Sequence, residues 1–217
     1  MQEIRLYYES LEQGSDYLLP MIREAVPKGT NIKLVKRPKK ANQFPNGALS
    51  SIMSFTTPDA LITGVKNGIE YPLANIEFTE AVKTEDHELQ RTYGALASYL
   101  SETFYIKISG HKESEKEFGG AEYNPFSTPK ILIDQFNYEG YIIADWGTEK
   151  DNKFTLKRNP NFPSCPPEIP ILKSTIQAIV KAFLKSEKSW YENSIKELKQ
   201  VSSYKSYRRS EERRVGK

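Results

Sequence analysis

The chain has 217 residues, with 31 lysines and arginines against 28 aspartates and glutamates and a formal net charge of +3. One cysteine excludes a disulfide framework, and no apolar run approaches the roughly 20 residues that a membrane-spanning helix needs. We therefore expect a cytoplasmic protein that does not enter the membrane.

The last nine residues, RSEERRVGK, resemble the in-frame translation of a sequencing adapter. We therefore expect one native domain over residues 1–208, truncated at its C-terminus, followed by nine non-native residues, 209–217. Those nine contain four basic and two acidic residues, which leaves 27 basic and 26 acidic residues before them. A domain so close to neutral has to attract nucleic acid through local patches rather than through its net charge.

The first 50 residues are predicted to hold a short strand or helix start at 4–14, an amphipathic helix at 15–26 and a basic loop from residue 31. The basic residues of that loop are either simply solvated or contact DNA phosphates. They are Lys33, Lys36, Arg37, Lys39 and Lys40. Residues 150–158 are a second candidate for backbone contact, through Lys153, Lys157 and Arg158.

A β-hairpin is predicted in the middle of the chain. Residues 58–65 are rich in aliphatic and β-branched side chains, and Asn67-Gly68 is a strong turn signal because both residues tolerate positive φ. The returning strand, 71–82, alternates apolar and polar residues, so that Glu77 and Thr79 share its polar face.

A helix is expected after Thr84, with a buried stripe at Leu89, Tyr93, Leu96 and Leu100. Residues 104–110, 130–136 and 140–146 are predicted strands, residues 171–184 a helix, and residues 189–200 its extension or a renewed helix. Strands alternating with helices in this order indicate an α/β fold with a mixed sheet.

The acids Asp59 and Glu77 raise the question of whether the hairpin is an active site or an ordinary hairpin. With a regular two-residue turn, Asp59 would face Ile76 and Glu77 would project to the opposite side of the sheet. Both acids can share one face only if the register slips by one residue, and Pro72 is a plausible bulge site because it donates no ladder hydrogen bond. An active site therefore predicts an irregularity between Gly68 and Ala74.

Two such carboxylates could hold Mg²⁺, which prefers oxygen ligands and often needs only one or two carboxylates. The main-chain carbonyl of Phe78 is a natural third ligand between Glu77 and Thr79. Phosphodiester hydrolysis requires such a cation together with an activated water.

Residues 58–107 resemble the PD-(D/E)xK nuclease superfamily, and within it the type II restriction endonucleases. Pro58-Asp59 matches the PD element and Glu77 the acidic position, followed by a helix with Gln90 and a strand with Lys107. The resemblance implies a restriction-endonuclease-like core, a mixed central sheet flanked by helices. It also implies that Gln90, and less so Arg91, assists at the phosphate, although both could simply face solvent.

The departure from the family pattern is Thr79, which stands where the family has lysine. A threonine hydroxyl cannot bring a positive charge to the reacting phosphate. Three explanations remain open. The metal ion carries more of the catalytic work, Lys83 or Lys107 supplies the positive charge from another position, or the site is inactive. The resemblance further implies that an N-terminal acid, Glu9 or Glu12, joins the site.

The expected function is that of a type II restriction endonuclease, which cuts double-stranded DNA at a specific site through Mg²⁺. The expected partners are a second copy of the chain, because palindromic sites suit a homodimer, and a cognate DNA methyltransferase. A repair or recombination exonuclease with the same core is one alternative. A non-catalytic DNA-binding or scaffold domain is the other.

Overall fold

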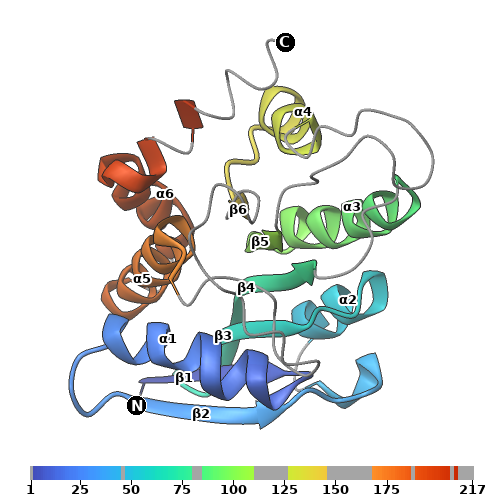
Figure 1. Ribbon diagram of the computed structural model, residues 1–217. Helices are drawn as coiled ribbons and strands as arrows, with labels where there is room; N and C mark the ends of the chain where they lie inside the picture. Colours follow the sequence, from blue (N-terminus) through green and yellow to red (C-terminus); the bar gives the residue numbers. More distant parts are fainter. Residues whose placement is uncertain are drawn as a thin grey trace.

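The computed structural model describes residues 2–44, 47–79, 85–109, 127–145, 168–186, 189–205 and 208–209. In this part of the chain the centre of the molecule is a six-stranded sheet with the order β2-β1-β3-β4-β5-β6 (Figure 1). The strands are β1 (Gln2–Tyr8), β2 (Asn31–Lys36), β3 (Ala60–Lys66), β4 (Ile69–Thr79), β5 (Phe104–Ser109) and β6 (Tyr141–Asp145).

The sheet is mixed because β3 is antiparallel to both of its neighbours, whereas the other adjacent pairs are parallel. The C-terminal ends of β1, β2, β4, β5 and β6 therefore meet the first residues of β3 at one edge of the sheet. In open α/β sheets, ligands usually bind outside the carboxyl ends of the strands. We therefore expect a ligand site at this end of the strands, the functional edge of the sheet.

Helices cover both faces of the sheet. Figure 1 shows α1, α5 and α6 on one face and α2 and α3 on the other, with α4 beyond α3. Their bounds, together with a π-helical segment η1 and a 3-10 segment η2, are η1 (Glu12–Leu18), α1 (Leu19–Ala25), η2 (Ala41–Gln43), α2 (Gly47–Phe55), α3 (Glu85–Leu100), α4 (Ser127–Phe136), α5 (Pro170–Lys185) and α6 (Trp190–Gln200).

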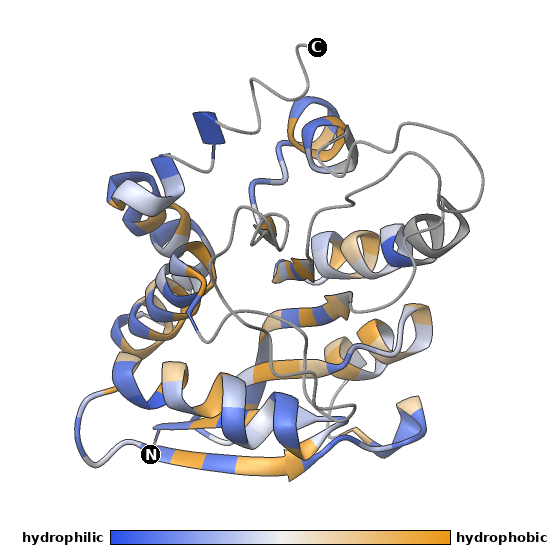
Figure 2. Ribbon diagram, viewed as in Figure 1, coloured by the Kyte–Doolittle hydropathy of each residue, from blue (hydrophilic) through white to orange (hydrophobic). Residues whose placement is uncertain are grey.

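The hydrophobic core lies between the sheet and these helices, where Figure 2 shows apolar strands under helices whose outer faces are polar. The larger cluster of buried side chains joins α1, α5 and α6 to the sheet. A smaller cluster on the other face packs α2 against β1 and β3, through Leu49, Ile52 and Met53 on the helix and Tyr7 and Leu61 on the strands. The α/β class predicted from the order of elements is confirmed.

The central hairpin forms as predicted. Asn67 and Gly68 adopt φ angles of 52° and 79° between β3 and β4. Ala74, Ile76 and Phe78 are buried on one face of β4, as its alternating pattern indicates. The predicted strands at 104–110 and 140–146 are β5 and β6, and the helix predicted at 171–184 is α5.

Three local predictions were wrong. Residues 31–36, predicted as the start of a loop, form the edge strand β2, because parallel pairing with β1 satisfies their main chain. Residues 130–136, predicted as a strand, lie in α4, where Leu132 is buried and Lys130 and Asp134 form an ion pair of 2.6 Å one helical turn apart. Helix α2 was not predicted.

The buried stripe predicted for the helix after Thr84 was wrong for two of its four residues, whereas Leu96 packs half-buried against the core and the side chain of Leu89 lies outside the described residues. Tyr93 and Leu100 on α3 are 50% and 68% exposed. The buried residues are small instead, namely Gly94, Ala95, Ala97 and Ser98. Small side chains let α3 approach the sheet closely, and the ring of Tyr105 on β5 lies directly against Gly94.

Across the described helices, none combines the length and the apolar character that crossing a membrane would require.

Candidate active site

A bulge in β4 determines which acids share a face of the sheet. From the turn up to Thr63 and Pro72 the hairpin pairs regularly, but Ile62 pairs with Ala74, so Leu73 is an extra residue. The predicted irregularity between Gly68 and Ala74 is confirmed. Beyond the bulge Ala60 pairs with Ile76, and the next step of the ladder places Asp59 beside Glu77.

A hydrogen bond ties the start of β3 to the end of β4. The main-chain N–H of Phe78 donates to Oδ2 of Asp59 over 2.7 Å. The main-chain N–H of Glu9 donates to the carbonyl of Asp59 over 2.8 Å, which holds the end of β1 to the same point. Asp59 is therefore fixed between two neighbouring strands at the functional edge of the sheet.

Both carboxylates face α3. Asn75, two residues before Glu77 on β4, is fully buried and donates to the Ser98 hydroxyl over 3.1 Å. Phe78 projects to the other face, where its ring meets that of Tyr17 at 5.8 Å between centroids. Since strand side chains alternate, Glu77 lies on the same side as Asn75, under α3.

The charges around Glu77 describe a compact ionic site. Burial and then the Asp59 carboxylate raise the pKa of Glu77 to about 8, with Glu9 acting in the same direction. Arg91 of α3 and Lys107 of β5 oppose this rise. Three carboxyl groups and two cations are thus close enough to influence one another: Glu9 just after β1, Asp59 just before β3, Glu77 on β4, Lys107 on β5 and Arg91 on α3.

The N-terminal acid that joins this group is Glu9 rather than Glu12. Glu9 lies just after β1, and its carboxylate pairs with Nη2 of Arg37 at 2.8 Å. Glu12 lies in η1, where its carboxylate accepts from the Ser10 hydroxyl over 2.6 Å and that bond lowers its pKa. Glu12 is not among the groups that act most strongly on Glu77.

The donor chemistry fits a hard divalent cation. The carboxyl groups of Asp59 and Glu77 are neighbours, and burial followed by the Asp59 carboxylate raises the pKa of Glu77, so a bound cation would favour its ionised form. Among the described residues, no three histidine, cysteine or acidic side chains gather closely enough to hold a metal ion by themselves. A metal here would therefore rest on Asp59, Glu77 and a main-chain oxygen, for which Phe78 remains the predicted ligand.

Several predicted site residues lie outside what the structure describes. The backbones of Thr79 and Gln90 belong to β4 and α3, but their side chains are not described. Lys83 lies between the described segments, as do three members of the second basic segment, Lys153, Lys157 and Arg158.

The first basic segment lies at the functional edge of the sheet. Lys33 and Lys36 are exposed on β2, and Lys39 and Lys40 are exposed just beyond its C-terminal end. Lys36 donates to the carbonyl of Glu9, and Arg37 pairs with the Glu9 carboxylate. The segment predicted to contact DNA is therefore joined to the acidic group through the end of β1.

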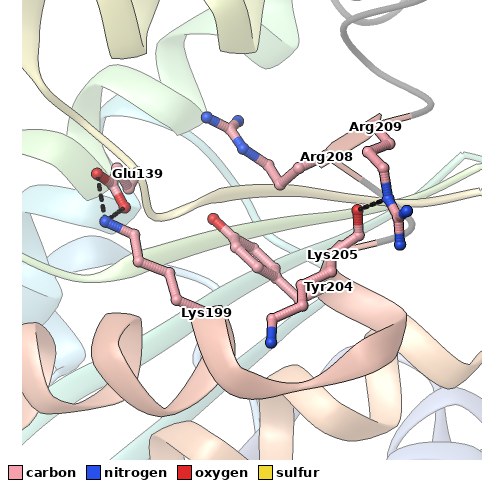
Figure 3. A pocket seen from close by; sticks show the side chains of 6 residues that line it. All are labelled: Glu139, Lys199, Tyr204, Lys205, Arg208 and Arg209. Carbon is pink, nitrogen blue, oxygen red and sulfur yellow. Dashed lines mark hydrogen bonds and ion pairs between the residues drawn. The ribbon is translucent and has the colours of Figure 1, made fainter.

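A separate basic pocket lies near the opposite edge of the sheet. It has a volume of about 600 Å³ and is lined by Glu139, Lys199, Tyr204, Lys205, Arg208 and Arg209 (Figure 3). Its only acid, Glu139, precedes β6 and pairs with Lys199 at 2.7 Å. Because the one carboxylate that lines it is already paired with Lys199, this pocket is given no role in catalysis.

The family resemblance made Arg91 and Lys107 candidates, but only tertiary structure brings them close enough to act on Glu77. Lys107 on β5 pairs in register with Glu77 on the adjacent parallel strand β4. The two strands are connected through helix α3, so no tight turn in the sequence reveals which residues are paired. No family model, curated protein or solved structure matches this chain, so the geometry of the site carries the functional assignment alone.

Proposed function

We propose that the chain is a magnesium-dependent endodeoxyribonuclease of the restriction type. The observation that carries this proposal is the β4 bulge, which brings Asp59 and Glu77 to one face of the sheet. An ordinary hairpin would gain nothing from a bulge that places two carboxylates together in a partly buried site. Ionising both carboxyl groups so close together costs free energy, and a cation bound between them during function would offset that cost.

The proposed reaction is hydrolysis of a DNA phosphodiester. A water oxygen forms a bond to phosphorus, the bond from phosphorus to the 3′ oxygen breaks, and the 3′ oxygen takes up a proton. Asp59, Glu77 and the Phe78 carbonyl would hold the cation. When bound, magnesium would supply positive charge to the phosphate as negative charge develops on it.

The order of elements around the site supports a restriction-endonuclease-like core. Asp59 directly precedes β3 and Glu77 lies on β4, α3 follows and contributes Arg91, and β5 returns beside β4 with Lys107. In this proposal Gln90, one residue before Arg91 on α3, assists at the phosphate, and Thr79 either orients the water or is a silent replacement.

Double-stranded DNA is the proposed substrate because exposed basic residues adjoin the acidic site. Lys39 and Lys40 follow β2 at the edge where Asp59 and Glu77 lie. Such residues position the phosphate backbone without reading sequence. Cleavage at a two-fold symmetric site would require a homodimer, and a restriction system would require a cognate methyltransferase.

The test is digestion of plasmid and linear DNA in Mg²⁺ by the parent protein, Asp59→Asn and Glu77→Gln. Both substitutions preserve side-chain shape and remove a carboxylate that would hold the cation. Each is expected to lower the cleavage rate by about 100-fold or more, since even the partners of metal ligands contribute about 10–100-fold. Asp134→Asn removes an exposed acid from α4 and is expected to cleave like the parent.

Discrete fragments from the parent support restriction-type cleavage. A ladder that shortens from the ends supports the exonuclease alternative instead. If the parent binds DNA without cutting it in Mg²⁺ or Mn²⁺, the chain is a binding module. Undiminished cleavage by Asp59→Asn and Glu77→Gln would show that the active site lies elsewhere.

A further inference from the structure

Lys107 is an unusual lysine because it is buried within the sheet beside the candidate site. It is 1% exposed, in the middle of β5, and it pairs in register with Glu77 of β4. A buried ammonium group is costly unless negative charge lies close by. Here the Asp59–Glu77 pair supplies that charge, since Lys107 pairs in register with Glu77 and acts on its ionisation.

The orientation of β5 places Lys107 on the catalytic face. Tyr105, two residues earlier on the strand, packs against α3, where a Cβ added to Gly94 would lie 2.8 Å from its ring. Because side chains alternate along a strand, Lys107 also projects toward α3. Asn75 and Glu77 of β4 occupy the same face.

A second buried lysine shows what a structural lysine in this sheet looks like. Lys66 is 3% exposed, donates to the main-chain carbonyl of Phe183 and lies 4.7 Å from the centre of that ring. These contacts join β3 to α5 on the face opposite the acids. Burial alone therefore does not distinguish the two lysines, but the proximity of Lys107 to the acidic pair does.

Arg91 is the other cation that acts on Glu77. It is only partly buried and belongs to α3, which covers the site. A guanidinium group at the rim suits contact with a DNA phosphate. Lys107, held in the floor by strand pairing, suits a fixed charge beside the reacting groups.

We propose that Lys107 is the active-site cation of the proposed nuclease and takes the role for which β4 has Thr79 instead of lysine. Its ammonium group offsets the negative charge of the Asp59–Glu77 pair and of the phosphate, and it donates a hydrogen bond that orients the attacking water. This inference rests on the proposed nuclease function. The active-site positive charge would then come from β5, the strand next to the one that carries Glu77.

The experiment compares single-turnover cleavage in Mg²⁺, DNA affinity in Ca²⁺ and Mg²⁺ affinity by calorimetry. Lys107→Met is expected to slow cleavage by about 100-fold or more. Its DNA affinity is expected to stay within about threefold of the parent, and its Mg²⁺ affinity to be equal or higher, since a repelling charge is gone. Arg91→Met is expected to weaken DNA binding more than it slows the bound reaction.

A rescue experiment separates a catalytic role of Lys107 from a structural one, because a lysine placed elsewhere can restore cleavage only if the charge itself is required. Thr79→Lys in the Lys107→Met background is expected to restore cleavage at least tenfold, because it returns an ammonium group two residues after Glu77 on β4. Lys66→Met is the matched control, since it removes an equally buried lysine on the other face. That control is expected to lose stability while its folded fraction still cleaves.

Three results would overturn the inference while leaving the nuclease proposal intact. One is cleavage by folded Lys107→Met within about threefold of a cleaving parent. Another is a folded double variant that shows no recovery. The third is failure of both variants to fold by circular dichroism, which would make Lys107 structural. A parent protein that does not cut DNA at all would instead refute the proposed function.

Discussion

Glu77 retains at neutral pH a proton that an ordinary carboxyl group has lost, because burial and the neighbouring Asp59 carboxylate raise its pKa to about 8. The two opposing cations, Arg91 and Lys107, do not cancel this effect. Such a site has unfavourable electrostatics when it is empty and ionised, and a bound cation relieves them. Metal affinity and fold stability should therefore both change with pH through this one side chain.

We predict that Glu77 makes the metal-free protein less stable as pH rises from about 5 to 8. Between the ordinary carboxyl pKa of 4.5 and about 8, the folded protein holds a proton that the unfolded chain releases. The free energy of unfolding therefore falls across this window, by at most about 1.4 kcal/mol per pH unit. The measurement is thermal unfolding of the parent and Glu77→Gln in a chelator.

The parent should lose stability relative to Glu77→Gln only between about pH 5 and 8. Titration of the other carboxyl groups changes the stability of both proteins equally. Mg²⁺ should stabilise the parent more at pH 8 than at pH 6, because the cation competes with the proton for the carboxylate. Parallel pH profiles of the two proteins would contradict the prediction.

Helix α3 is the element on which the geometry of the site depends. Its inner face is small, and Gly94 lies against the buried ring of Tyr105, which itself packs edge-on against Tyr141 at 4.9 Å between centroids. The Gly94 carbonyl accepts hydrogen bonds from Ser98 and Asn75. Close seating of this helix brings Arg91, one turn earlier, to the acidic pair.

We predict that Gly94→Ala lowers both stability and cleavage. The added methyl would meet the Tyr105 ring at 2.8 Å, and overpacking of this kind costs about 1–3 kcal/mol, which exceeds the gain in helix propensity. Urea denaturation measures the change. Gly47→Ala in α2 is the control, because a Cβ there meets nothing within 4 Å and should be neutral or stabilising.

Cleavage by Gly94→Ala should fall more than its folded fraction accounts for, because α3 has to move outward with Arg91. If the variant is destabilised and its folded fraction cleaves at the parent rate, the seating of α3 is structural only. A stabilised variant would show that Tyr105 can yield, contrary to the packing described above.

A buried polar network supports β1, β3 and β4 away from the acidic pair. The Glu70 carboxylate accepts from Arg5 over 2.6 Å, from Thr63 over 2.6 Å and from Tyr7 over 3.0 Å. Burial and then Glu70 raise the pKa of Tyr7 to about 12, so the phenol stays a hydrogen-bond donor. Because all four side chains have to meet, the network reinforces the strand register that precedes the bulge.

At the scale of the whole molecule, exposed lysines lie on more than one side of the sheet, although the net charge is small. The exposed lysines after β2 adjoin the acidic site, whereas Lys181 on α5 and Lys196 on α6 lie over the opposite face. Of these two groups, the lysines after β2 lie beside the proposed catalytic acids, so a duplex that is cut should bind at the edge where those strands end.

We predict that Lys39→Glu/Lys40→Glu weakens binding of duplex DNA by at least about tenfold at physiological salt. Losing two phosphate contacts should also lower the slope of log affinity against log salt by about 2. Fluorescence anisotropy in Ca²⁺ measures both quantities. Lys181→Glu/Lys196→Glu, which changes the net charge equally, is expected to have a much smaller effect, and equal weakening by the two pairs would contradict the placement of DNA.

Local chemistry in the sequence determined the central hairpin and its irregularity. Asn67-Gly68 specified the turn, alternation specified which face of β4 is buried, and Pro72 marked the stretch where the register slips. The long apolar periodicity of α5 was sufficient to predict a helix. These features depend on backbone preferences of a few adjacent residues, so they can be read without knowing the rest of the fold.

Tertiary structure alone decided how the candidate residues assemble. Nothing local places Lys107 beside Glu77, makes Asn31–Lys36 an edge strand or buries the small face of α3, because each depends on a partner distant in the chain. The apolar residues of α4 were too few to separate a helix from a strand by periodicity. Burial against distant elements outweighs local preference, and it is this burial that assembles the ionic site.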